Sequence, residues 1–516
     1  MLFKNKISPL FIPCAIILFL ICFACKDSSF SYTIKTELNP NKISPLTAQL
    51  KVSANMPCSV SFKVLGESPI EQSFDEVSEN LVISIVGLYA NTTNDVVITY
   101  RYEGGKVHDT IKIKTNALPE GFPSIKINTL NRVKMESGLH GCDIHLANNG
   151  TFNSMPLIFD DQGQIRWYFD LSFNGKMISP FQRLADGTVL MVSRHNIFEF
   201  DMLGKQLKQS VISQNYGMHH DVVVLPNGNL LVCIGKKNEF INVEGEQIRS
   251  DSDFIILYDR EKGKIIKEWD LAKHLDVSRQ ERNYIKKGDW LHMNGLAFNE
   301  KDSTIIVSGR NQGLSKISWD DKLEWILSEN KNWGKSGRSG DGFETKPYIL
   351  KAVDENGNAY ANNIQNGKIS TEDFDFAWGP HAPEVLPNGN IIVFDNGVYR
   401  NFNDENNYSR AVEFEINDVD KTVKQVWQFG KERGEAFYSS IISDVDYLSN
   451  SDNILVTSGF VTPKENHNGK IVEVSRATGE VVFEATLYFK TLTGRKVGGW
   501  GQTDLMYRSE RLELKY

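Results

Sequence analysis

The chain has 516 residues and a formal net charge of −8, with 57 lysine and arginine residues against 65 aspartate and glutamate residues. This length allows one large repeat domain together with a smaller one. Because the net charge is acidic and no lysine- or arginine-rich block interrupts it, nucleic-acid binding is excluded at the level of the whole chain, whereas a local cationic pocket for a small anion is not.

The start of the chain is typical of a secretory signal of the lipoprotein type over residues 1–24. Lys4 and Lys6 form its basic start, and the apolar stretch over residues 12–23 is too short to span a membrane. Cys25 follows a small residue, as in a bacterial lipobox. We therefore expect an exported lipoprotein that is periplasmic or on the cell surface. Cys25 would anchor it to a bacterial membrane, which we expect to be the outer membrane. Ordinary signal cleavage and an uncleaved anchor are the alternatives.

A short tether and a small β-sandwich domain are predicted next, over residues 25–30 and 31–117. Six segments of alternating apolar and polar residues are separated by turns rich in Asn, Pro and Gly, the pattern of a small sandwich. These segments cover residues 31–38, 46–52, 58–64, 81–86, 95–102 and 110–115. The cysteines beyond the signal, Cys58, Cys142 and Cys233, show neither metal-ligand spacing nor a disulfide framework.

A repeat begins near residue 125. Asp-Gly or Asn-Gly turns between apolar runs near residues 187, 228 and 389 predict tight hairpins, because both central residues tolerate positive φ. A second turn-and-strand unit occurs six times, starting at residues 161, 201, 259, 320, 417 and 476. The pattern predicts an all-β fold, with a six-bladed β-propeller over residues 125–516. Uneven spacing predicts insertions, notably over residues 327–375.

Three histidines occupy one register position of this repeat. His220 and His381 each lie six residues before the proline of Pro-Asn-Gly-Asn, and His292 lies six residues before Phe298 in the same slot. Equal register in a repeat protein places such residues at equivalent points in space, so we expect a histidine-lined pocket near the mouth of the central channel.

Further polar residues are expected around this pocket. Ser179 and Ser443 fill the same register position in two other blades, and Arg310 ends the second strand of the His292 blade. His219 is expected to point away from the pocket, because neighbouring residues of a strand face opposite sides. His140 and His145 have no counterparts in the repeat and receive no role.

Two chemistries fit three histidines and an arginine. One is a metal site, since three imidazoles can hold zinc. The other is an anion site, in which cationic donors neutralise an oxyanion while a remaining imidazole attacks it. Arg310 favours the second, because a cation opposes metal binding, and we therefore assign no metal. Taken singly, each histidine would more often be a hydrogen-bonded structural residue, so the shared register carries the functional interpretation.

An ordered set of motifs resembles those of the bacterial arylsulfate sulfotransferases. The motifs are Met-His-His-Asp at residues 218–221, Trp-Leu-His-Met-Asn-Gly at 290–295, Ser-Gly-Arg-Asn-Gln at 308–312, Trp-Gly-Pro-His-Ala-Pro-Glu at 378–384 and Tyr-Ser-Arg-Ala-Val-Glu-Phe at 408–414. Residues 87–94 also resemble the end of the N-terminal domain of that family. The resemblance covers nearly the whole mature chain. It implies a six-bladed propeller behind a β-sandwich, and transfer of a sulfuryl group between phenols without the nucleotide donor PAPS, a metal or another cofactor.

Carried over motif by motif, the resemblance makes His381 the nucleophile, which would form a transient sulfohistidine in a ping-pong cycle. His220, His292 and Arg310 would bind the sulfonate, and Asn294 would join them. Ser443 is a positional expectation for a further substrate contact. The enterobacterial members carry a disulfide near the active site, but this chain has no cysteine pair between residues 310 and 400. Dependence on a dedicated disulfide machinery is therefore not expected.

The implied partners are a small-molecule aryl sulfate donor, a phenolic acceptor and the membrane through Cys25; the family also includes homodimers. A sulfate-ester hydrolase, with water as the acceptor, is the second enzyme hypothesis. A lipid-anchored propeller that binds a ligand without catalysis is a third, because the fold alone does not fix function. A calcium-dependent propeller lactonase is disfavoured, since the register positions carry His and Ser instead of Asp, Glu and Asn.

Overall fold

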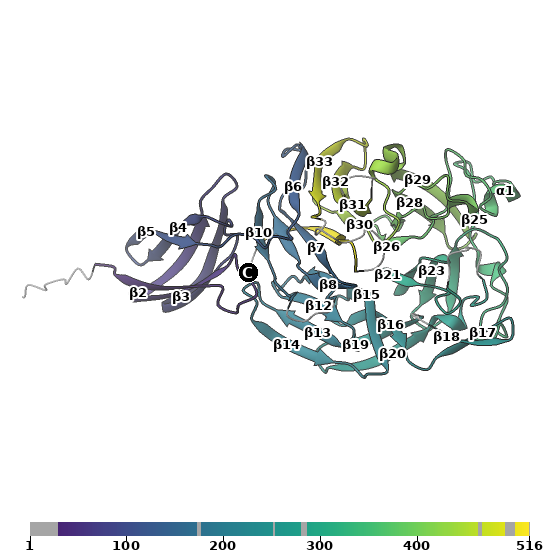
Figure 1. Cartoon of the computed structure of the whole chain (residues 1–516), viewed down its shortest axis with the longest axis horizontal. Helices are drawn as coiled ribbons and strands as arrows, with labels where there is room; N and C mark the ends of the chain where they lie inside the picture. The colour runs from purple at the N-terminus through teal and green to yellow at the C-terminus, as the bar shows by residue number, and fades with distance from the viewer. Residues whose placement is uncertain are drawn as a thin grey trace, which may run out of the picture.

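A computed structural model describes residues 29–172, 177–250, 253–279, 286–462, 467–490 and 501–514. Nearly all regular structure in these residues is strand, arranged as an N-terminal sheet beside a ring of six further sheets (Figure 1). The predicted all-β class is confirmed, and the ring of six sheets beside an N-terminal sheet fits the predicted six-bladed propeller preceded by a small sandwich. The signal sequence and the expected lipid attachment at Cys25 lie outside the described residues.

The N-terminal sheet is built around one long strand. Its strands are β1 (Tyr32–Leu38), β2 (Ala48–Val64), β3 (Ile70–Ile85), β4 (Thr93–Tyr102) and β5 (Gly105–Lys114). β3 runs along β2, while β1 pairs with the first half of β2 and β4 with the second half. The sequence pattern predicts separate strands at residues 46–52 and 58–64; instead, register shifts next to Ser53 and Cys58 let one strand bend through both.

Five sheets of the ring follow in chain order, and the first strand of each lies innermost. They are β11 (Phe181–Arg183), β12 (Val189–Ser193), β13 (Asn196–Phe200), β14 (Gln206–Val211); β15 (Tyr216–Val224), β16 (Leu230–Lys236), β19 (Phe254–Asp259), β20 (Lys264–Asp270); β21 (Met293–Asn299), β22 (Thr304–Gly309), β23 (Gly313–Ser318), β24 (Leu323–Leu327); β26 (His381–Val385), β27 (Ile391–Asp395), β28 (Arg410–Asn417), β29 (Thr422–Phe429), β25 (Lys351–Ala352); and β30 (Asp444–Leu448), β31 (Asn453–Val461), β32 (Asn468–Ser475), β33 (Val481–Tyr488). Contacts between β15 and β21, β21 and β26, and β26 and β30 place these first strands around the axis.

The ring is closed by strands from both ends of the propeller chain. In the first blade, β34 (Leu505–Leu512) pairs with β7 (Leu139–Asn148), which continues into β8 (Thr151–Ser154), β9 (Leu157–Phe159) and β10 (Ile165–Tyr168). In the last blade, β6 (Ser124–Leu130) pairs with β33 as an outer strand. The last described strand therefore occupies the channel side of the first blade.

Insertions extend from the blades. The hairpin of β17 (Phe240–Val243) and β18 (Glu246–Arg249) lies between β16 and β19 in the sequence. The long segment between β24 and β26 holds β25 together with two short helices, η3 (Lys346–Tyr348) and α1 (Asn362–Gln365). Three further short helices are η2 (Leu271–Lys273), η4 (Arg400–Phe402) and η5 (Lys431–Ala436). Within the part of the chain described here, no helix is long and apolar enough to cross a membrane.

The hydrophobic core of the ring lies between neighbouring sheets. Trp269 of β20 and Trp290, which precedes β21, are fully buried in one cluster that joins their two blades. The sandwich docks on the first blade through Arg166, whose guanidinium donates to the carbonyl oxygen of Gly87 and stacks 3.7 Å from the ring centroid of Tyr89. Blade packing of this kind holds the inner strands, and any side chains they carry, in fixed positions.

Candidate active site

The inner strands of three consecutive blades bulge where they carry the predicted histidines. Register shifts interrupt the ladders of β15, β21 and β26 at these points. The backbone enters the left-handed region at three non-glycine residues: His220 (φ 55°), His292 (φ 50°) and Ala382 (φ 48°). Such conformations cost on the order of 1–3 kcal/mol each and gather at functional sites. A bulge breaks the strict alternation of a strand, so adjacent side chains can face one cavity.

A cavity of about 670 Å³ opens at this end of the channel and is lined by residues of the first four blades. Its histidines include His219, His220 and His292. Its apolar and aromatic walls come from Phe152, Met177, Tyr216, Met218 and Tyr507, and its basic residues are Arg194, Lys236, Lys237, Arg249 and Lys286. Among the lining residues, Asp289 is the single acid. The cavity thus combines room for an aromatic ring with a strongly basic wall.

His219 lies in this cavity, contrary to the expectation that it points away. Its Nδ1 is 2.8 Å from Nδ1 of His220, so one of the two imidazoles donates a hydrogen bond to the other. The ring of His220 also stands 5.2 Å, centroid to centroid, from the ring of His292. The bulge in β15 explains the difference, because it removes the alternation on which the expectation was based.

Burial keeps three of the imidazoles neutral. Desolvation, followed by the charge of Arg310 and then of His292, lowers the pKa of His381 from 6.5 to about 3. Desolvation and then His292 lower the pKa of His219 to about 4. The pKa of His220 is held well below its ordinary value by desolvation, by the neighbouring histidines and by Arg310. Neutral imidazole has a free lone pair, which is the form needed for nucleophilic attack.

One buried amide fixes the tautomer of His381. Nδ2 of Asn396 donates to the carbonyl oxygens of Ser439 and Ile442, both at 2.8 Å. With both amide hydrogens used, Oδ1 of Asn396 must accept, and it lies 2.7 Å from Nδ1 of His381. His381 therefore carries its proton on Nδ1, which also lies 3.2 Å from the carbonyl oxygen of Gly379. The lone pair is left on Nε2.

His292 has a different partner. Its Nδ1 lies 2.7 Å from Oδ2 of Asp289, and both side chains are about one quarter exposed, 27% and 24%. A carboxylate at Nδ1 orients the ring, as in the histidine–carboxylate pairs of general acid–base catalysis. Among the cavity histidines, His292 is thus equipped to exchange a proton.

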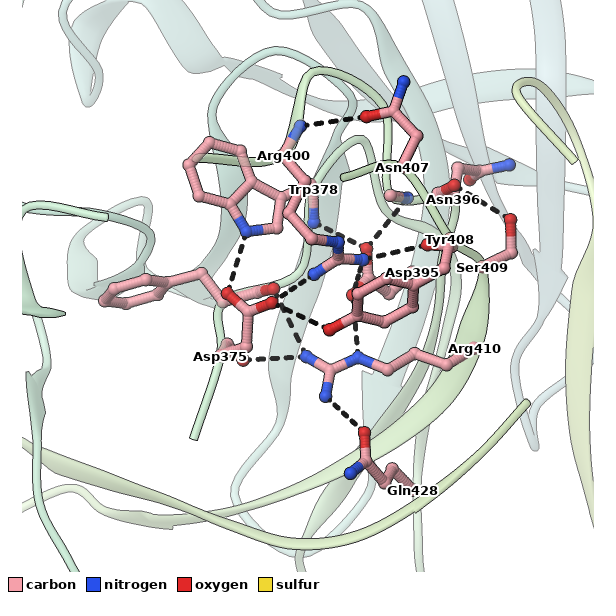
Figure 2. Close-up of polar contacts among 12 residues, drawn as sticks. Asp375, Trp378, Asp395, Asn396, Arg400, Asn407, Tyr408, Ser409, Arg410 and Gln428 are labelled. Atoms are coloured by element: carbon pink, nitrogen blue, oxygen red, sulfur yellow. Dashed lines mark hydrogen bonds and ion pairs between the residues drawn. The ribbon is translucent and has the colours of Figure 1, made fainter. Parts of the chain in front are cut away.

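A buried ionic network supports the segment that leads into His381 (Figure 2). Arg400 pairs with Asp375 and, at 2.8 Å, with Asp395, while Arg410 donates to Asp395 at 2.9 Å. The other oxygen of Asp395 accepts the backbone N–H groups of Trp378, at 2.7 Å, and of Gly397. The network therefore ties together the two segments that carry His381 and Asn396.

Gly397, next to Asn396, is required by the close approach of the chain. Its φ is +75°, and a Cβ at this position would lie 1.7 Å from the carbonyl oxygen of Tyr408. A larger residue would move the segment that carries Asn396.

Comparison with known proteins identifies the family. The family model for arylsulfotransferase (ASST) matches residues 129–496, and the model for the arylsulfotransferase Ig-like domain matches residues 35–116. The chain belongs to the arylsulfotransferase family. It is an enzyme of sulfuryl transfer, so a non-catalytic propeller is no longer a candidate.

Two relatives of this arylsulfotransferase are similar over most of their length. Proteins named arylsulfate sulfotransferase AssT, from Lelliottia amnigena and from Escherichia coli O6:H1 (strain CFT073), are each 27% identical, and each match covers 87% of this chain and 89% of the relative. Among solved structures, a protein of unknown function from Bacteroides caccae matches at 14% identity with a TM-score of 0.41, covering 72% of this chain and 98% of that one.

Four predicted site residues lie outside the cavity lining: Asn294, Arg310, His381 and Ser443. Asn294 donates through Nδ2 to the carbonyl oxygen of Pro380 at 2.8 Å and so anchors the residue before His381, while its buried Oδ1 has no partner among the described residues. Arg310 donates to the carbonyl oxygen of Ser440 at 3.4 Å and lies close enough to lower the pKa of His381. His381 itself is 3% exposed and also stands behind the lining.

Ser179 and Ser443, the two serines at the histidine register, differ. Ser179 lines the cavity and donates to Oδ2 of Asp143 at 2.6 Å. Ser443 is buried; its hydroxyl donates to Oγ of Ser439, lies 3.5 Å from the carbonyl oxygen of Ile441 and accepts the N–H of Gly459, so its bonds stay within the protein.

His140 and His145, which received no role, are buried away from the histidine cluster. His140 stacks between Phe159 and Phe483, and the ring of His145 bonds Ser154 and Asp143. The described histidines and carboxylates form no group of three or more that could hold a metal ion, and the three described cysteines are buried and free.

The sequence reasoning missed Asn396 and Asp289. A signal for Asn396 exists, because Asn396 and Arg194 each lie seven residues after the glycine of their hairpin turn, Gly389 and Gly187. In the sequence, register positions were compared only in the first strand of each blade. The same comparison at the ends of the second strands would have found Asn396 and Arg194. Asp289 lies in a loop between blades and carries no repeat signal.

Proposed function

We propose that this arylsulfotransferase moves a sulfuryl group from an aryl sulfate ester to a phenolic acceptor, independently of PAPS, by a ping-pong mechanism with a sulfohistidine on His381. The observation that carries the proposal is the bond from Nδ1 of His381 to Asn396, which leaves a neutral Nε2. The motif resemblance and the names of the relatives support aryl sulfates and phenols as the substrates.

In the first half-reaction, Nε2 of His381 attacks sulfur. The S–N bond forms as the ester S–O bond breaks, and the electron pair leaves with the phenolate oxygen. Arg310 and an N–H of His220 stabilise the sulfonate oxygens, each by on the order of a few kcal/mol. Protonated His292 gives its Nε2 proton to the departing phenolate, while Asp289 retains the Nδ1–H bond.

The second half-reaction reverses these steps with a new phenol. Neutral His292 takes the phenolic proton, the phenol oxygen attacks sulfur, and the S–N electron pair returns to Nε2 of His381. Because His381 keeps its Nδ1 proton throughout, the ring of the sulfohistidine is cationic and leaves sulfur as neutral imidazole, a good leaving group. Each group ends the cycle as it began.

The test is nitrophenolate release from 4-nitrophenyl sulfate by the purified chain, with and without phenol. We expect release that depends on phenol, and loss of nearly all activity in His381→Ala. His108→Ala, at an exposed histidine of the sandwich, is the matched control and should retain full activity. Undiminished turnover in His381→Ala would refute the sulfohistidine, and equal release without phenol would establish the hydrolase instead.

We also propose export as a lipoprotein anchored through Cys25, on the strength of the basic start and apolar stretch of the first residues. Cys25→Ala should then move the chain from the membrane fraction to the soluble fraction. Membrane retention of that variant would contradict the lipid anchor.

A further inference from the structure

Four basic residues on the cavity wall have no acidic partner in the part of the chain that the structure describes. They are Arg194 after β12, Lys237 after β16, Arg249 at the end of β18 and Lys286 ahead of β21. A fifth, Lys236, is paired with Glu268 at 2.8 Å, and the single acid of the lining, Asp289, is bonded to His292. We refer to Arg194, Lys237, Arg249 and Lys286 as the basic rim.

The charge of the whole molecule does not account for the basic rim. The chain carries a net charge of −8, yet four cations with no acidic partner among the described residues line one cavity. Like charges brought together repel, and a cleft lined by one sign of charge concentrates ions of the other sign. The basic rim therefore creates a positive electrostatic potential that attracts an anion.

The part of the basic rim around Lys237 lies apart from the expected sulfonate position, whereas Arg194 pairs with Met218, two residues before His220. Lys236, next to Lys237, pairs across the ladder with Tyr216, which precedes His220 by four residues in β15. With a rise of about 3.3 Å per strand residue, this places the Lys237 end of the rim roughly 13 Å along the strand from His220. A sulfonate held between His220, His292 and Arg310 would therefore leave the rim for another anionic group.

The wall between the two positions suits an aromatic ring. Tyr216 and Met218 of β15, Phe152 at the first blade and Tyr507 of β34 line this stretch of the cavity. Aromatic and thioether side chains favour contact with an aryl group. From the histidines outward, the cavity offers sulfonate donors, then an apolar wall with Arg194 beside it, and then Lys237.

We propose that the aromatic substrates of this enzyme carry a second anionic group, a carboxylate or a further sulfate, which the basic rim binds. The inference rests on the proposed function, because it takes the transferred sulfuryl group to be held at the histidines. Donor and acceptor occupy the same cavity in turn in a ping-pong cycle, so the rim selects both.

Unreactive sulfonates test the proposal without turnover. Calorimetry would compare benzenesulfonate with 4-sulfobenzoate, which differ by one carboxylate and whose C–S bond resists transfer. We expect 4-sulfobenzoate to bind about tenfold more tightly at low ionic strength, and the advantage to shrink with added salt. In the double variant Arg194→Glu, Lys237→Glu the preference should disappear, whereas the double variant Lys35→Glu, Lys51→Glu, the same charge change on the sandwich, should keep it.

Turnover separates this proposal from the function on which it rests. With 4-nitrophenyl sulfate as the donor, 4-hydroxyphenylacetate should give a higher kcat/KM than its neutral amide. If no acceptor supports release but 4-sulfobenzoate still binds more tightly than benzenesulfonate, the transfer mechanism is wrong and the rim stands. Equal binding of the two sulfonates, or no binding of either at millimolar concentration, would overturn the proposal for the rim.

Discussion

At the scale of single residues, the reactivity of His381 depends on Asn396. The amide holds a proton on one ring nitrogen and so makes the other the nucleophile. It does so from a fully buried position, fixed by two backbone carbonyl groups. Asn396 is thus a positioning residue, because it acts through His381 and need not touch the substrate.

Replacing Asn396 should change the rate without changing donor binding. In Asn396→Ala the ring is free to turn or to exchange its tautomer, so we expect kcat to fall about 10²-fold while benzenesulfonate binding is kept. In Asn396→Asp a negative charge faces Nδ1 and raises the pKa of His381, which lies at about 3 in the native site. The rate of that variant should therefore fall at an acidic pH that leaves the wild type unaffected. A purely structural role for Asn396 would lower binding and rate together at every pH.

At the scale of elements, the blade of β26, β27 and β28 depends on Asp395. This carboxylate is fully buried, pairs with Arg400 and Arg410 and accepts two backbone N–H groups. Asp395→Asn would leave two buried guanidinium groups short of a counter-charge, which typically costs about 3–5 kcal/mol. We expect chemical denaturation to show a loss of that size, against almost no change for Asp320→Asn on the surface. Similar midpoints for the two variants would contradict the importance given to the network.

Elements with a local signal could be predicted from the sequence, and elements without one could not. The Asn-Gly turn at Gly228 and its counterparts are set by backbone conformations that few residues tolerate, so the hairpins and the histidine register followed from the pattern. The closing strand β34 pairs with β7 at the other end of the propeller chain, and no local sequence pattern predicts a partner so far away in the chain. The bulge at His220 depends equally on tertiary context, which is why His219 was misplaced.

At the scale of the whole molecule, the two ends of the channel differ in the ionisable residues that line them. The histidine cavity is basic, while a second cavity at the far end of β15 is lined by several carboxyl groups, among them Glu384, Asp444 and Glu510. Burial raises the pKa of these groups, to about 7 for Glu384, about 6 for Asp444 and about 8 for Glu510. Their protonation stabilises the folded chain as the pH falls, the reverse of the effect of the buried histidines.

The comparison of wild type with His381→Asn isolates the contribution of this histidine to the pH dependence of stability. Below pH 6.5 the unfolded chain binds a proton at His381, but the folded site does not do so until about pH 3. As the pH falls through this window, the free energy of unfolding therefore decreases by about 1.4 kcal/mol per pH unit for one histidine. When the free energy of unfolding is measured in urea at several pH values between 7 and 5, its slope against pH should be smaller by that amount in His381→Asn than in the wild type. Parallel curves for the two proteins would mean that His381 is already protonated in the folded state.

The closing strand has a consequence for the order in which the enzyme becomes active. β34 supplies Tyr507 to the cavity wall, and Arg508 of the same strand reaches Asp221, beside His220, at 3.1 Å. A ribosome makes this strand after every motif histidine has emerged. A translation product interrupted before β34 would hold all the motif histidines and still lack the closed ring that brings them together, so synthesis itself delays the chemistry until β34 has been made.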